Sequence, residues 1–107
     1  MSPPDLKDAL RLVETLALAP LARSETTRPK SHFGSGGAYT KWASADREVQ
    51  RYVISKLQEH GAHIGLGDGA RIRFAGVTGS STMGLRSALR NWKAGVERRL
   101  ADRKATR

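Results

Sequence analysis

The last quarter of the chain carries an apolar repeat that is long enough to constrain the fold. Large apolar side chains recur there every three or four positions, which is the spacing of one face of an α-helix. A helix with such a stripe must bury it against other elements, so we expect this helix to pack on the core. It is predicted to begin near Ser80–Thr82, which can cap it, and to fray over residues 101–107. The stripe consists of Leu85, Leu89, Trp92, Val96 and Leu100.

The segment before this helix predicts a β-hairpin. Two short runs of β-forming residues flank Gly67-Asp68-Gly69, which is a typical turn sequence. The second run alternates, so Ile72 and Phe74 should face one side of the strand. Arg71 and Arg73 should face the other side. Because an isolated hairpin is only marginally stable in water, its apolar side should pack on the helices and leave both arginines outward.

The first half of the chain predicts two more helices separated by a long loop. Apolar side chains recur at helical spacing over residues 4–19. Pro20 is expected to end or kink this helix, with a short continuation possible to Arg23. Residues 24–40 are rich in Gly, Ser and Thr and lack periodicity, so we expect a loop there.

The second helix is expected from about residue 41 or 45 to residue 60. Ser44 can cap its start, and Gly61 lies where glycine favours a helix end. The predicted order is therefore α-α-β-β-α. This is a small α+β domain of three helices and one β-hairpin, spanning residues 1–107 as a single unit.

The charge of the chain points to a polyanionic partner. The sequence has 19 basic and 10 acidic residues, a formal net charge of +9. Residues 80–107 hold eight basic and two acidic residues, so their net charge is +6. A clustered positive field attracts polyanions, and we therefore predict a non-enzymatic protein that binds nucleic acid, DNA or RNA. An arginine-rich composition with a simply solvated tail is the plainer alternative.

The candidate nucleic-acid-binding residues lie on the hairpin and along one edge of the last helix. The helix edge lies beside the apolar stripe, so hairpin and helix cations would form a continuous phosphate-binding patch if they share one face. No helix-turn-helix, zinc-finger or RNA-recognition pattern accompanies them. The predicted set is Arg71, Arg73, Arg86, Arg90, Lys93, Arg98 and Arg99.

Three other functions stay open at this stage. The first or the last helix can mediate a homodimer or dock on a partner in a phage, plasmid or nucleoprotein assembly. A small nuclease or toxin would use His60 or His63 for acid–base chemistry. Residues 76–82 can offer N–H and hydroxyl groups to an anion, but they lack the lysine of a P-loop, and we interpret them as a turn and helix cap.

No catalytic residue, cofactor or metal is expected. The acids are scattered, and the histidines lack the i, i+4 spacing of a helical metal site. The chain has no cysteine and no apolar run near the ~20 residues of a membrane span. Asp5, Asp8 and Glu14 argue against a signal peptide, so we expect a cytoplasmic protein with no membrane partner.

Overall fold

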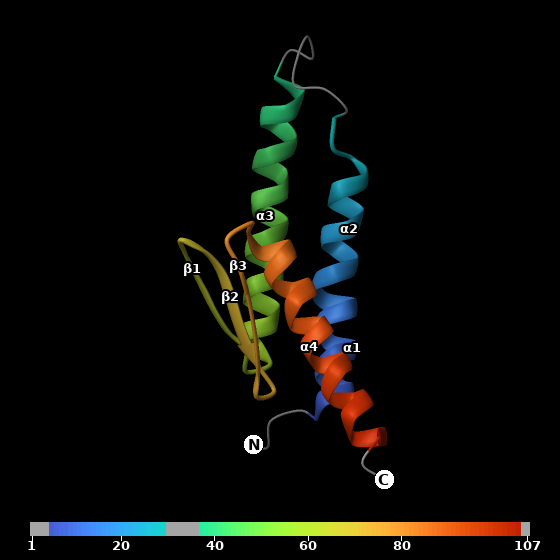
Figure 1. Ribbon diagram of the computed structural model, residues 1–107. Coiled ribbons are helices and arrows are strands. Elements are labelled where there is room, and N and C mark those ends of the chain that lie inside the picture. The colour runs from blue at the N-terminus through green and yellow to red at the C-terminus, as the bar shows by residue number, and fades with distance from the viewer. Residues whose placement is uncertain (1–4, 30–36, 106–107) are drawn as a thin grey trace.

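The computed structural model describes residues 5–29 and 37–105, which form an α+β fold of helices and one antiparallel sheet (Figure 1). The elements are α1 (Leu6–Val13), a π-helical segment η1 (Glu14–Leu18), α2 (Ala19–Thr26), α3 (Ala38–Glu59), β1 (His63–Gly67), β2 (Gly69–Phe74), β3 (Val77–Ser81) and α4 (Leu85–Ala105). α1, η1 and α2 follow one another directly and form the first helical stretch. One face of the sheet packs on α4, α4 in turn contacts α1, and η1 and α2 pack against α3.

The first helical stretch continues past Pro20, where the sequence predicted an end or a kink. Asp5 caps its start, because the Asp5 carboxylate accepts a hydrogen bond from the Asp8 N–H at 2.8 Å. Proline lacks an N–H and its ring clashes with the carbonyl four residues back. Directly before the proline, the Ala19 N–H donates to the Glu14 carbonyl five residues back. This π-helical widening changes the hydrogen-bond register and lets the chain stay helical.

Helices occupy both ends of the predicted loop. α2 extends to residue 26, and α3 begins at Ala38, so Ser44 lies inside the helix and does not cap it. The rings of Tyr39 and Trp42 lie 5.7 Å apart, and the Trp42 indole N–H donates to the Ser24 carbonyl at 2.8 Å. The hydrogen bond from Trp42 holds the first turns of α3 against α2. The middle of the predicted loop, residues 30–36, lies outside the described residues.

The sheet has three strands in the order β1-β2-β3, where the sequence predicted a two-stranded hairpin. The β1–β2 hairpin is confirmed. β3 lies in the segment predicted as a turn and cap, and that prediction is wrong. Ala75 and Gly76 have φ of 53° and 78°, two consecutive positive values that give the tight turn between β2 and β3. An Ala-Gly pair is a weak signal for such a turn, and the Val-Thr-Gly-Ser-Ser sequence of β3 resembles a loop in composition.

Gly79 in β3 permits direct contact between the sheet and α4. A Cβ at Gly79 would lie 2.5 Å from the main-chain nitrogen of Trp92 and 2.6 Å from the carbonyl oxygen of Ala88. A Cβ on the helix side, at Gly95, would lie 3.2 Å from a methyl group of Val77. Both elements therefore carry glycine at the contact between β3 and α4.

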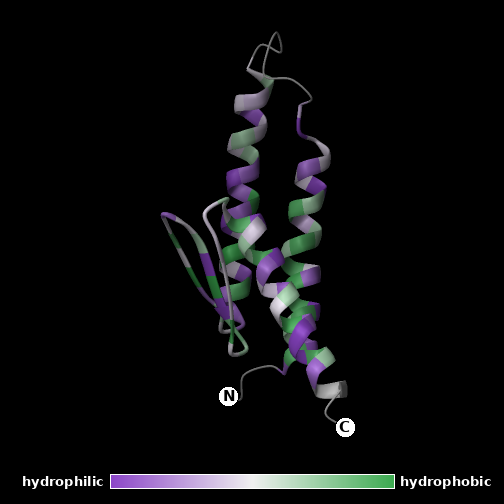
Figure 2. Ribbon diagram, in the orientation of Figure 1, coloured by the Kyte–Doolittle hydropathy of each residue, from purple (hydrophilic) through white to green (hydrophobic). Residues whose placement is uncertain are grey.

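The apolar stripe of the last helix is confirmed as its contact with the core. Leu85, Leu89, Trp92 and Val96 are buried, and Leu100 packs at the border. The Trp92 indole donates to the carbonyl of Phe74 at 3.0 Å, and the two rings stack at 5.8 Å. Figure 2 shows hydrophobic segments along the helices where they lie beside one another.

The predicted start of the last helix is wrong. The helix begins at Leu85, because Ser80 and Ser81 belong to β3 and Gly84, with φ of 117°, separates strand from helix. It extends to Ala105, and residues 106–107 lie outside the described residues. Fraying of residues 101–107 stays a prediction.

Replacing Gly79 with alanine tests the backbone contact. The new methyl group would meet main-chain atoms that cannot move without separating β3 from α4, so we expect Gly79→Ala to lower the free energy of unfolding by about 3 kcal/mol. Urea unfolding followed by circular dichroism measures the loss. Gly65→Ala is the matched control, since a Cβ there meets nothing within 4 Å. Equal stability of the two variants would contradict this account of Gly79.

Candidate nucleic-acid interface

The face of the sheet turned away from α4 presents Arg71 and Arg73. Residues along β2 alternate in burial, so that Ala70, Ile72 and Phe74 are buried while the two arginines are exposed. This is the orientation that the alternation of the sequence predicted. Neither guanidinium makes a hydrogen bond or an ion pair with any residue that the structure describes. Both therefore remain available to an anionic ligand.

The side chains that surround these arginines on the sheet are short or polar and include no carboxylate. Arg73 pairs across the sheet with His63 on β1 and with Thr78 on β3. Arg71 pairs with Gly65 and Ser80. Residues directly opposite in an antiparallel sheet point to the same face, so all of these belong to the outer face. We call the six residues His63, Gly65, Arg71, Arg73, Thr78 and Ser80 the outer sheet face.

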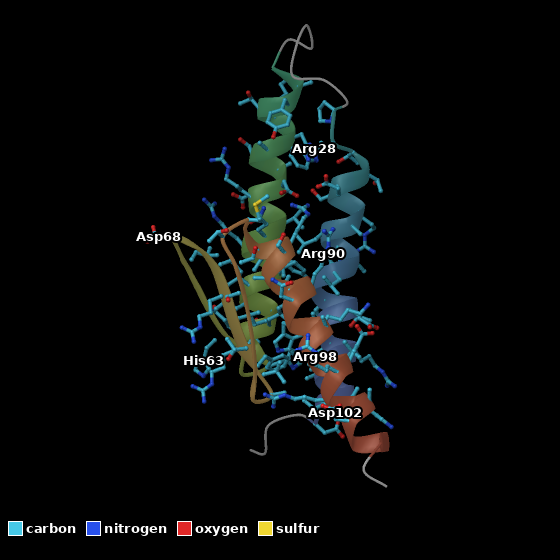
Figure 3. The ribbon with its side chains drawn as sticks, in the orientation of Figure 1. Arg28, His63, Asp68, Arg90, Arg98 and Asp102 are labelled. Atoms are coloured by element: carbon cyan, nitrogen blue, oxygen red, sulfur yellow. The ribbon has the colours of Figure 1, made fainter. Side chains whose placement is uncertain are left out.

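The outer sheet face carries no carboxylate. The nearest acid along the strands is Asp68 in the β1–β2 turn, and Figure 3 shows it at the tip of the hairpin. An open hollow of about 580 Å³ lies at this end of the sheet, lined in part by Gly65, Arg71 and Ser80. The small side chains on either side of Arg71 leave its guanidinium accessible.

Arg86, which the sequence placed among the binding residues, holds the helices together. Its Nη1 and Nη2 donate to the two carboxylate oxygens of Asp46 at 2.8 and 2.6 Å. Nη2 also donates to the Leu21 carbonyl at 3.0 Å, and Nε lies 3.5 Å from Glu25. With these contacts made inside the fold, the guanidinium has little left to offer a phosphate. We therefore assign Arg86 a structural role.

Asp46 is the partner that sequence reasoning missed. In a helix capped by Ser44, Asp46 would lie in the first turn, but α3 starts at Ala38 and Asp46 lies buried against α2 and α4. Its carboxylate also accepts hydrogen bonds from Ser24 at 2.5 Å and from Gln50 at 2.9 Å. Hydrogen bonds from Arg86 lower the pKa of Asp46 most, Ser24 and Gln50 add to this, and burial opposes it.

The remaining predicted cations follow α4 away from the outer sheet face. Arg90 borders a hollow of about 240 Å³ with α2, and the Lys93 amine lies 3.6 Å from the Glu14 carboxylate on η1. Arg99 donates to the carbonyl of Gly76 at 3.2 Å, next to the β2–β3 turn. Arg90 and Arg98 are labelled along α4 in Figure 3. The structure therefore does not bring the seven predicted cations onto one face.

The histidines do not form an acid–base pair with the nearby acid. His63 and Asp68 lie at opposite ends of the hairpin in Figure 3. His60 lies at the end of α3 and is exposed. Within residues 5–29 and 37–105, no group of three or more His, Cys, Asp or Glu is arranged to hold a metal ion. His32 lies outside the described residues.

Comparisons with known proteins identify no relative of this chain. No family model, no curated protein and no solved structure matches this chain. Among the described helices, none combines the length and the apolar character needed to cross a bilayer.

Replacement of Arg86 tests its structural role. Arg86→Met keeps much of the side-chain volume but leaves the buried Asp46 charge without its main partner, so we expect a loss of about 3 kcal/mol in the free energy of unfolding. Arg90→Met, one turn further along the same helix and exposed, should change stability by less than about 0.5 kcal/mol. Urea unfolding of both variants measures the difference, and similar losses would refute the assignment.

The lowered pKa of Asp46 predicts an acid-sensitive fold. A carboxyl whose folded pKa lies below its unfolded value stabilises the fold above the unfolded pKa and loses this contribution as the pH falls through the folded pKa. Stability should therefore drop between about pH 5 and pH 2. Asp46→Asn should be less stable at neutral pH and show a flatter pH dependence over that range. Glu48→Gln, an exposed acid on the same helix, should keep the wild-type profile.

Proposed function

We propose that this protein binds duplex DNA through its outer sheet face, without catalysing a reaction. The observation that carries the proposal is the pair of exposed arginines, Arg71 and Arg73, on an uncovered sheet face without a carboxylate. When two unpaired cations contact phosphates, the counterions condensed on the nucleic acid are released, and this release favours binding. The net charge of +9 adds a long-range field that favours encounter with a polyanion.

The geometry of the sheet favours DNA over RNA as the duplex. Strands lie about 4.8 Å apart, so two neighbouring strands of this sheet form the kind of two-stranded ribbon that the major groove of B-form DNA admits. The major groove of B-form DNA is about 12 Å wide, whereas that of A-form RNA is deep and narrow. Proteins that read DNA with strands insert them into such a groove. Arg71 and Arg73 are also of the type that pairs with guanine edges, and Thr78 and Ser80 offer hydroxyls beside them.

The other functions considered from the sequence have less support. The apolar residues of the first helical stretch are used in the core, so that stretch offers less surface to a partner than its leucine content suggested. A nuclease would need an acid–base pair, and the separation of His63 from Asp68 offers none at the hairpin. A cytoplasmic location remains part of the proposal.

Binding to labelled duplexes at several salt concentrations tests the proposal. The wild-type protein should bind DNA, and the logarithm of its affinity should fall linearly with the logarithm of salt concentration. The double variant Arg71→Gln/Arg73→Gln should weaken binding at least about tenfold, and the salt slope should decrease by about 2. Fluorescence anisotropy measures both quantities, with an RNA duplex of the same sequence as the comparison.

A charge-matched variant separates the outer sheet face from diffuse attraction. Arg90→Gln/Arg98→Gln removes the same charge from α4 and should retain affinity within about threefold. Equal losses in the two double variants would show that net charge alone drives binding. A larger loss in the α4 variant would move the interface to the helix, and no binding by wild-type protein would refute the proposal.

A further inference from the structure

The outer strand β1 has a free edge. β1 lies at the end of the strand order and pairs only with β2, and among the described residues it makes no backbone hydrogen bond on its other side. Figure 1 shows it as the outermost strand of the sheet. Edge strands usually avoid further pairing by means of lysine, proline, a bulge or an inward charge. The β1 sequence, His-Ile-Gly-Leu-Gly, has none of these residues.

We propose that β1 pairs antiparallel with β1 of a second copy of this chain, with the two-fold axis through Gly65. The resulting assembly is a symmetric dimer with a continuous six-stranded sheet. This inference does not depend on DNA binding.

The side chains of β1 are complementary to themselves in this register. Ile64 of each copy lies opposite Leu66 of the other, on the side of the sheet that packs on the helices. Leu66 is 61 % exposed in the single chain, and the pairing would cover it. On the outer side, Gly65 faces its own copy and His63 faces Gly67, so no bulky pair obstructs the contact. A partner of a different sequence would have to supply this match by chance.

The charges at the two ends of β1 favour the same arrangement. Arg73, which pairs with His63 of β1, lies at one end, and Asp68 lies at the other end, in the turn. Antiparallel pairing places the acidic end of each copy beside the basic end of the other. A parallel arrangement would place like charges together, so electrostatics selects the two-fold register.

The size of the contact sets its strength. Five residues of each copy take part in the pairing. The surface area that they bury is smaller than the 1,200–2,000 Å² of a typical stable interface. The dimer should therefore be reversible and depend on concentration.

In the dimer, the two β2 strands lie three strand spacings apart, about 14 Å, and their arginines share one outer face.

Cysteine cross-linking tests the register directly, since the natural chain has no cysteine. Gly65 lies on the two-fold axis, where facing Cα atoms are about 4.5–5.5 Å apart, within disulfide range. Gly65→Cys should therefore form covalent dimers under mild oxidation without nucleic acid. Gly67→Cys is the matched control, because its two copies would lie about 14 Å apart. A Cβ at either glycine meets nothing within 4 Å.

We expect at least tenfold more cross-linked dimer from Gly65→Cys than from Gly67→Cys. Equal yields, or a higher yield from Gly67→Cys, would overturn the register. In the cysteine-free protein, sedimentation should show a mass that rises above 11.7 kDa with concentration. Leu66→Lys should abolish the rise, while Met83→Lys, at another highly exposed apolar residue, should not. A strict monomer at millimolar concentration would overturn the dimer itself.

Discussion

The close contact of Gly79 with the backbone of α4 determines which side of this molecule can meet a ligand. With no Cβ in the way, the helix lies directly on β3, and the Trp92 indole reaches the Phe74 carbonyl on β2. That contact covers one face of a three-stranded sheet and leaves the other uncovered. Because side chains alternate along β2, burial of Ile72 places Arg71 and Arg73 on the open side. The candidate interface is thus a consequence of how the core packs.

Periodic patterns in the sequence predicted the parts of the fold that depend on a single element. The apolar stripe of the last helix and the alternation of β2 both gave correct orientations, because each follows from the geometry of one helix or one strand. β3 was missed because Gly79 is required by its neighbour α4, and nothing in its local sequence reports that neighbour. Continuation of the helix through Pro20 was missed for a similar reason, since it depends on a change of hydrogen-bond register upstream.

The candidate site was predictable only in part, because charge in a sequence does not tell which charges are already used. Arg71 and Arg73 were placed correctly on the outward side of a strand. Arg86 was grouped with them on helical spacing, but its partner Asp46 lies 40 residues earlier in the chain. Only the folded structure separates an arginine that neutralises a buried carboxylate from one that faces solvent.

The Asp46 carboxylate also affects how the protein unfolds. It accepts hydrogen bonds from Ser24 in α2, Gln50 in α3 and Arg86 in α4, so three helical segments meet at one buried charge. If α3 or α4 opened alone, the buried Asp46 carboxylate would be separated from Arg86, at a cost of several kcal/mol. Opening of α2 would remove the hydrogen bond from Ser24 to Asp46 and the Leu21 carbonyl that accepts from Arg86. Partial opening is therefore suppressed, and amides of α2, α3 and α4 should exchange with solvent together, in one cooperative unit.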